Sequence, residues 1–114
     1  MTDPSERSPY LEEGLALFRA GEFFLAHETL EEYWIEAPAA ERDFYQGLIH
    51  VAVAFHHLGR ANPKGALLQL RKARSRLDGY PRRYHGIDVG SLRQFLDQAP
   101  ARIEDGEAVA PPPL

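Results

Sequence analysis

Cysteine is absent from this chain of 114 residues, which also has only one methionine and one tryptophan. The absence excludes disulfide bonds, thiolate zinc sites and thiol nucleophiles. It suits a reducing compartment, and we therefore expect a cytoplasmic protein.

Long apolar segments are also lacking. The longest apolar run, residues 48–55, is interrupted by His50, and it is far shorter than the roughly 20 residues that span a bilayer. Residues 1–9 carry no apolar stretch typical of a signal peptide. Because hydrophobic residues make up 44% and charged residues 26% of the chain, we expect one globular domain without a membrane partner.

Helical periodicity runs through most of the chain, and no stretch alternates with period two for long enough to predict a strand. The spacing of apolar residues predicts helices over 9–20, 22–36, 40–58 and 62–78, then a short fifth helix that begins at Asp88 or Ser91 and ends at Pro100. The third helix is apolar nearly all round, which is typical of a central element. We predict an all-α domain over residues 9–99, with disordered segments at 1–8 and 100–114.

The helices pair into two tandem antiparallel hairpins. The first hairpin, with Gly21-x-Phe23-x2-Ala26-x3-Leu30 followed by Pro38, resembles a tetratricopeptide unit. Solenoids need at least about three repeats. We therefore predict a compact bundle of about five helices that shares this hairpin geometry.

Polar residues occur on helix faces that otherwise point inward. His27 and Glu31 lie on the apolar stripe of the second helix, and Gln46, His50 and His57 share one face of the third. An unpaired buried polar group costs about 1–3 kcal/mol. One hypothesis is therefore a metal site: His27 and Glu31, completed by His50 or His57, would suit zinc, iron or manganese, and Glu28 would act as base for a bound water.

The alternative is a hydrogen-bond network of His27, Glu31, Gln46 and His50 that only fixes how two helices pack. Known motifs do not decide between the two. Glu31 stands where the HExxH motif of zinc proteases has its second histidine, and the Glu-x-x-His pair of di-iron bundles is missing.

Charge is unevenly distributed. Residues 1–45 carry 11 acidic and 3 basic side chains, whereas residues 60–85 carry one acid and eight basic residues: Arg60, Lys64, Arg71, Lys72, Arg74, Arg76, Arg82 and Arg83. Because one segment is mainly acidic and the other mainly basic, the two could form oppositely charged faces, which favours pairing with another protein or with a second copy of the chain. Nucleic acid is a weaker hypothesis because the net charge is −4 and few aromatics interleave with the cations.

One family resemblance covers residues 10–77. The chain carries Gly21-x-Phe23-x2-Ala26-His27-Glu28-x2-Glu31-x2-Trp34, then Phe44-Tyr45-Gln46-Gly47, His56-His57, Asn62 and Gly65. This pattern resembles the bacterial and archaeal family called domain of unknown function 309. The resemblance implies a small helical protein of uncharacterised role, in a family sometimes labelled predicted metal-dependent hydrolases.

The same resemblance marks Trp34, Gln46 and Asn62 as candidate ligand-binding residues. The residues themselves offer simpler roles for part of the pattern. Gly47 and Gly65 fit close contacts between helices, and Asn62 fits a helix cap.

Overall fold

The computed structural model describes residues 8–114. Over these residues the chain forms α1 (Pro9–Arg19), α2 (Phe23–Glu36), α3 (Ala39–Gly59), α4 (Pro63–Arg76) and α5 (Val89–Glu104), with β1 (Arg83–Tyr84) and β2 (Ile87–Asp88) between α4 and α5. The predicted all-α bundle of five helices is confirmed. Of the predicted N-terminal segment, only Ser8 lies within this range.

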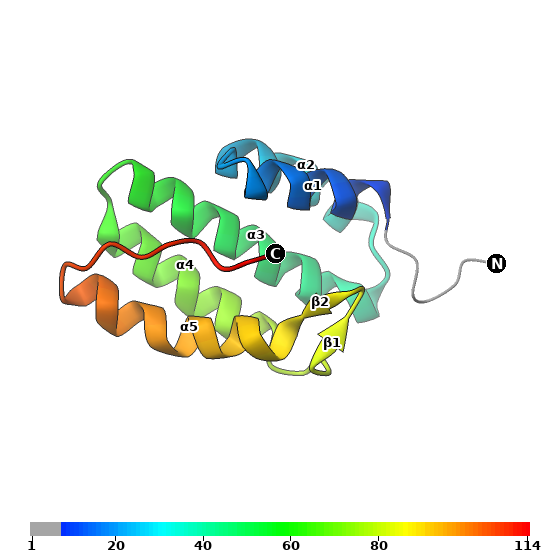
Figure 1. The fold of residues 1–114 in the computed structure, drawn as a ribbon. Helices are drawn as coiled ribbons and strands as arrows, with labels where there is room; N and C mark the ends of the chain where they lie inside the picture. Colours follow the sequence, from blue (N-terminus) through cyan, green and yellow to red (C-terminus); the bar gives the residue numbers. More distant parts are fainter. Residues whose placement is uncertain (1–7) are drawn as a thin grey trace.

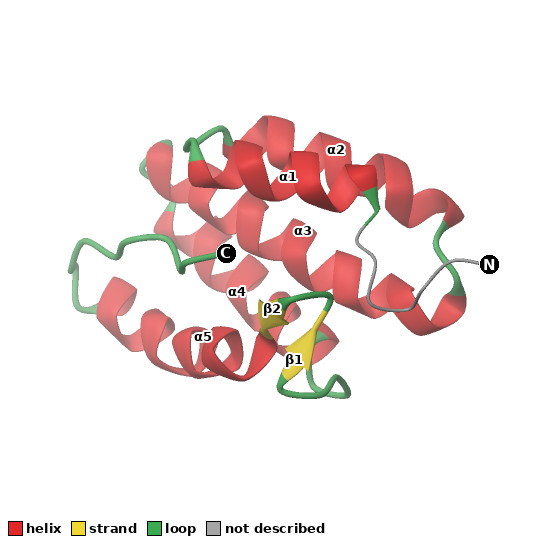
Figure 2. Ribbon diagram, turned by 45° about the vertical axis from the view of Figure 1, so that its right-hand side comes forward, coloured by secondary structure: helices red, strands yellow, loops and turns green. Residues whose placement is uncertain are grey.

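The central element is α3, as predicted. It packs against α2 on one side and against α4 on the other, while α1 packs on α2 and α5 packs on α4. Figure 1 and Figure 2 show α1 and α2 along one side of α3, with α4 and α5 along the other. Within residues 8–114, none of the helices combines the length and apolar character that a membrane-spanning segment requires.

The core is apolar and draws on every helix. The largest fully buried side chains are Leu11, Leu15, Phe44, Tyr45, Leu48, Val51, Leu70, Leu77, Val89 and Leu92. No polar or charged side chain of the described part is fully buried. His27, Glu31, Gln46, His50 and His57 are therefore only partly buried at the edge of the core.

Three helices begin with a side-chain cap. Ser8, Asn62 and Asp88 accept hydrogen bonds from the backbone N–H groups of Leu11, Gly65 and Ser91. Such caps satisfy a backbone donor that has no partner inside the helix. The predicted role of Asn62 as a cap is confirmed.

Two glycines of the family pattern, Gly47 and Gly65, stand at close approaches. A Cβ on Gly47 would lie 2.6 Å from the side chain of Leu77, and one on Gly65 would lie 2.6 Å from the amide of Asn62. Both positions therefore need the absence of a side chain, as the sequence indicated.

Two local predictions were wrong. Residues 83–88 form a small antiparallel hairpin in which Tyr84 pairs with Ile87, although the sequence predicted no strand. Its turn residues, His85 and Gly86, both have positive φ, 50° and 76°, as a type I′ turn requires. The fifth helix also continues through Pro100 to Glu104, because burial of Ile103 offsets the cost of a proline inside a helix, about 3 kcal/mol.

Residues 105–114 follow α5 and contain neither helix nor strand. The sequence predicted this tail to be disordered. The structure places it between α1 and α5 (Figure 1), where Val109 and Leu114 pack against the core.

Candidate functional site

The predicted metal ligands occupy three separate places. The Nε2 atom of His27 lies 2.9 Å from Oε2 of Glu31, one turn further along α2. The Nδ1 atom of His50 lies 2.6 Å from Oε1 of Gln69 in α4, and Nδ1 of His57 lies 3.2 Å from Nδ2 of Asn62. The structure thus joins His27 to Glu31 and brings neither His50 nor His57 to that pair.

This arrangement does not fit the metal centre that the family label implies. Catalytic zinc sites in proteins have three protein ligands, and structural sites have four. Residues 8–114 contain no group of three or more His, Cys, Asp or Glu side chains that could hold one ion. The described residues do not show the expected convergence, because His50 contacts Gln69 of α4, whereas His27 contacts Glu31 of its own helix. Ligation by any of these residues, with Glu28 as base, stays a prediction, and Glu28 itself is exposed.

The four-residue packing network is not formed either. His27 contacts Glu31, while His50 contacts Gln69, so the two histidines belong to different pairs. The side chains of His27 and Glu31 are 22% and 47% exposed. A sealed interior network is therefore excluded for these residues.

Trp34 lies half-buried near the end of α2. The guanidinium carbon of Arg42 stands 4.7 Å from the centroid of its ring system, which is a cation–π contact. Its indole Nε1 is buried without a hydrogen-bond partner in the described part of the chain. The cation–π contact joins the start of α3 to α2.

Two of the sequence-predicted residues do meet at a cleft. Gln46 and His50, one turn apart on α3, line a hollow of about 440 Å³ together with Asp43, Lys72, Ser75 and Arg76. The last three residues lie on the facing side of α4. Every side chain that lines the cleft is polar or charged.

The electrostatics of this cleft are dominated by cations. Arg76 Nη1 lies 2.9 Å from Asp43 Oδ1, so the carboxylate neutralises part of the positive charge of Arg76. Within residues 8–114 no ion pair involves Lys72. Burial lowers the pKa of His50, the nearby Lys72 and Arg76 lower it further, and the hydrogen bond with Gln69 opposes them.

His50 is consequently a neutral, oriented imidazole near pH 7. An amide oxygen can only accept a hydrogen bond, so Nδ1 carries the proton that is donated to Gln69. The Nε2 atom then remains as an acceptor. The cleft thus combines one imidazole acceptor with donors from an ammonium, a guanidinium, a hydroxyl and an amide.

Sequence reasoning identified only the α3 side of this cleft. The signal for the α4 side was present, because Gln69, Lys72 and Arg76 are spaced i, i+3 and i+7, as are Asp43, Gln46 and His50. Both rows place polar residues on one helix face. Two such rows on adjacent helices of a hairpin would have predicted the cleft.

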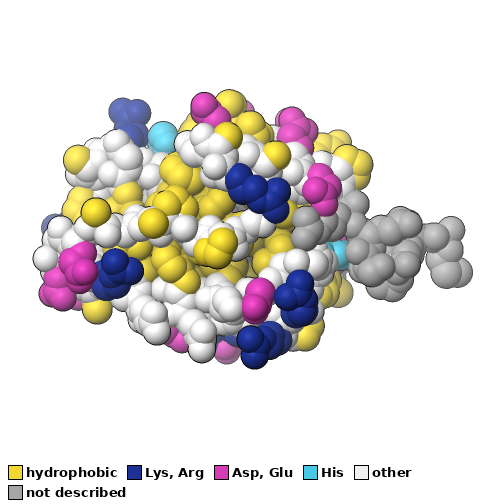
Figure 3. Space-filling view, in the orientation of Figure 1, with side chains coloured by type: hydrophobic (Ala, Val, Ile, Leu, Met, Phe, Trp, Pro, Cys, Tyr) yellow, Lys and Arg dark blue, Asp and Glu magenta, His cyan; other side chains and the backbone are white. Residues whose placement is uncertain are grey.

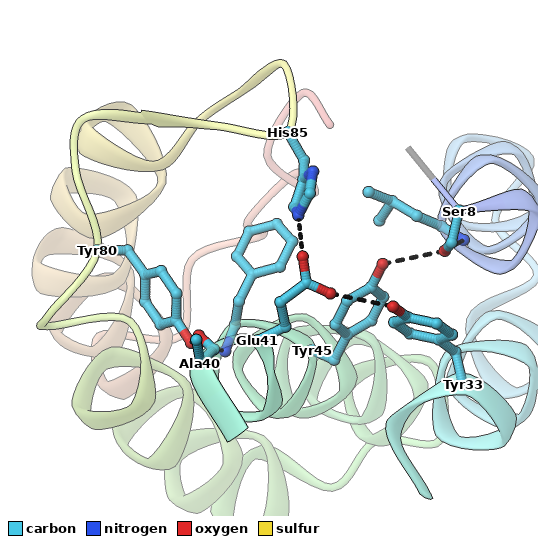
Figure 4. A network of polar contacts seen from close by, with 9 residues as sticks. Ser8, Tyr33, Ala40, Glu41, Tyr45, Tyr80 and His85 are labelled. Carbon is cyan, nitrogen blue, oxygen red and sulfur yellow. Dashed lines mark hydrogen bonds and ion pairs between the residues drawn. The ribbon is translucent and has the colours of Figure 1, made fainter. Parts of the chain in front are cut away.

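A second polar cluster surrounds Glu41 (Figure 4). Its carboxylate lies 2.6 Å from Nε2 of His85 and accepts a hydrogen bond of 3.0 Å from the Tyr33 hydroxyl. The Tyr45 hydroxyl lies 3.0 Å from Oγ of Ser8, and burial raises the pKa of Tyr45 to about 12.

Tyr80 makes two further hydrogen bonds beside this cluster. Its hydroxyl donates to the carbonyl oxygen of Ala40 and accepts from the N–H of Phe44. The polar groups around Glu41 are thus engaged in joining the β1–β2 hairpin to α2 and α3. We assign this cluster a structural role.

Comparison with solved structures finds a conserved hypothetical protein from Thermus thermophilus. The two chains are 40% identical and superpose with a TM-score of 0.69, which covers 83% of this chain and 99% of the Thermus chain.

Two curated relatives are longer than this chain. An uncharacterised protein of Aquifex aeolicus (strain VF5) is 31% identical over 111 residues, which cover 96% of this chain and 32% of the Aquifex protein. The uncharacterised protein YpuF of Bacillus subtilis (strain 168) is 34% identical over 86 residues, which cover 73% of this chain and 49% of YpuF. The chain thus spans about a third to a half of the length of these two relatives.

A family match covers just over half of the chain, residues 11–68, and includes most of α1, all of α2 and α3, and the start of α4. The matched segment contains His27, Glu31, Trp34, Gln46 and Asn62, the residues on which the earlier resemblance depended. The chain belongs to the family described as Domain of unknown function (DUF309).

Proposed function

We propose that this protein binds a small anionic ligand in the cleft between α3 and α4. The observation that carries the proposal is the cleft itself, a hollow of about 440 Å³ that only polar and charged residues line. Its volume falls in the range of small-molecule sites, about 300–1,000 Å³. A lining without apolar side chains favours a small, strongly polar ligand.

The lining residues supply both cationic groups and neutral hydrogen-bond donors that suit an anion. The Lys72 ammonium supplies a charge that no ion pair within residues 8–114 neutralises. Arg76 is oriented by Asp43, and guanidinium groups match the planar geometry of carboxylate and phosphate oxygens. Gln46 and Ser75 add neutral donors.

Binding of inorganic phosphate and sulfate tests the proposal. In a titration followed by amide chemical shifts, we expect saturable shifts at residues that line the cleft. Lys72→Ala should weaken binding about ten- to a hundredfold, since a hydrogen bond to a charged group contributes about 1.5–3 kcal/mol. Lys64→Ala is the matched control, because Lys64 is an exposed lysine on the same helix, outside the cleft.

Two results would count against the proposal. One is the absence of saturable shifts at the cleft at millimolar anion. The other is an equal loss of affinity in the two lysine variants, which would show a general charge effect. Metal-dependent hydrolysis is not part of the proposal, because residues 8–114 bring no three of the candidate metal ligands together.

A further inference from the structure

The face of the molecule opposite the cleft carries an apolar groove. Gln46 and Phe55 are nine residues apart on α3, so their side chains leave the helix about half a turn from each other. The groove lies on the Phe55 side, between α1 and α5. Figure 3 shows hydrophobic side chains gathered across the middle of this face.

Phenylalanine rings from four segments line the groove. The ring centroids of Phe18 and Phe23 are 5.1 Å apart, those of Phe23 and Phe55 are 5.6 Å apart, and those of Phe55 and Phe95 are 6.0 Å apart. Leu58, Leu92 and Ile103 extend this surface. The result is a continuous aromatic and aliphatic floor.

The chain's own residues 107–114 lie in this groove. Pro112 is buried and Val109 and Leu114 are half-buried against the core, so the apolar contacts recur at positions i, i+3 and i+5. Three consecutive prolines restrict φ and favour an extended conformation. Aromatic grooves that receive such preformed extended segments are a common recognition mode.

The tail does not fill the groove completely. Hollows of about 310, 180 and 420 Å³ remain where Pro111, Pro112, Pro113 and Val109 meet the groove. Prolines have no N–H to donate. The hydrogen bond that fastens the end of the segment runs from Arg19 Nη2 to the carbonyl oxygen of Leu114, at 2.6 Å.

We propose that this groove is a docking site for an extended, proline-rich segment of another chain, and that residues 107–114 are its competing occupant from the same chain. The recognised pattern is apolar-x-x-Pro-x-apolar, as in Val109, Pro112 and Leu114. A competitor binds only those molecules whose groove is empty. Its apparent affinity is therefore the intrinsic affinity multiplied by the fraction of molecules in which the tail has left the groove. The inference concerns a different face from the proposed anion cleft and does not depend on it.

A release variant of the full chain tests this inference. Val109→Glu with Leu114→Glu places two carboxylates where the tail meets apolar surface, so the tail should leave the groove. A fluorescent peptide of residues 107–114 should then bind the release variant at least tenfold more tightly than it binds the unmodified protein, as measured by fluorescence polarisation. A peptide with glutamate at positions 109, 112 and 114 is the matched control.

Arg19→Ala, added to the release variant, should weaken peptide binding because it removes the donor to Leu114. The inference is overturned if the folded release variant does not bind the peptide at millimolar concentration, or if the control peptide binds equally well. Circular dichroism establishes that the variant is folded.

If the release variant fails to fold, the unmodified protein still decides the question. Excess peptide should shift the amide resonances of Leu58 and Phe95 and sharpen those of the displaced tail, and unchanged spectra at millimolar peptide overturn the inference. A concentration-dependent dimer that is lost in the release variant would support it, with a second copy as the source of the segment.

Discussion

At the scale of single residues, Gly47 is one of the positions in the described fold where a side chain has no room. The Leu77 side chain that stands against it is fully buried. Because its neighbours in the core are close-packed, Leu77 has little room to move away from an added methyl group.

We predict that Gly47→Ala lowers the free energy of unfolding by about 1–2 kcal/mol, since overpacking costs about 1–3 kcal/mol and the better helix propensity of alanine returns up to about 1 kcal/mol. Urea unfolding measures the change. Gly59→Ala is the control, because nothing lies within 4 Å of its added Cβ, and it should leave stability unchanged or raise it. Equal stabilisation of both variants would contradict the close approach at Gly47.

The candidate site was only half predictable at this scale. Helical spacing showed that Gln46 and His50 share a face of α3, because that depends on local geometry alone. It could not show which neighbouring helix covers that face. The pairing of His50 with Gln69, and not with His27, is a property of the tertiary fold.

At the scale of elements, the β1–β2 hairpin depends on Glu41 at the start of α3. That carboxylate holds His85 of the turn and Tyr33 of α2 together. The side chains of His85 and Glu41 are only 6% and 19% exposed, so solvent competes weakly for this contact.

Glu41→Ala should therefore lower the free energy of unfolding by about 1–3 kcal/mol, because it removes the acceptor for partly buried donors. Thermal or urea denaturation measures the loss. Glu104→Ala is a suitable comparison, since Glu104 makes an exposed contact of 3.5 Å with Arg71 and such pairs contribute little. Comparable losses in both variants would argue against a fastening role for Glu41.

The first four helices were predictable because caps, prolines and apolar stripes act locally. The hairpin was not predicted because His85-Gly86 replaces the usual Asn-Gly turn signal, and its strands have two residues each. The end of α5 was misplaced because a local rule about proline was outweighed by burial of Ile103, a tertiary effect.

At the scale of the whole molecule, protonation of His50 couples the cleft to global stability. Its pKa is lowered in the folded state by burial and by Lys72 and Arg76, against the hydrogen bond with Gln69, which raises it. The acid Asp43 also lines the cleft. The unfolded chain thus takes up a proton at this residue at a higher pH than the folded chain does. Stability must then rise with pH through that interval.

We accordingly predict that the protein loses stability as the pH falls from about 7 to about 5. In this interval the unfolded chain, with the ordinary histidine pKa of about 6.5, binds a proton at residue 50 before the folded chain does. Measured against the unmodified protein, His50→Gln should gain relative stability over this interval. Urea unfolding at several pH values provides the comparison. A stability difference that is independent of pH would contradict a lowered pKa at His50.

The placement of α2 and α4 on two sides of α3 has an electrical consequence. The α2 helix carries Glu28, Glu31, Glu32 and Glu36 and no lysine or arginine, whereas α4 carries Lys64, Arg71, Lys72, Arg74 and Arg76 and no acid. The molecule therefore has a permanent dipole directed across α3. An anionic surface attracts the α4 flank and turns α2 outward, although the net charge of the whole protein is −4.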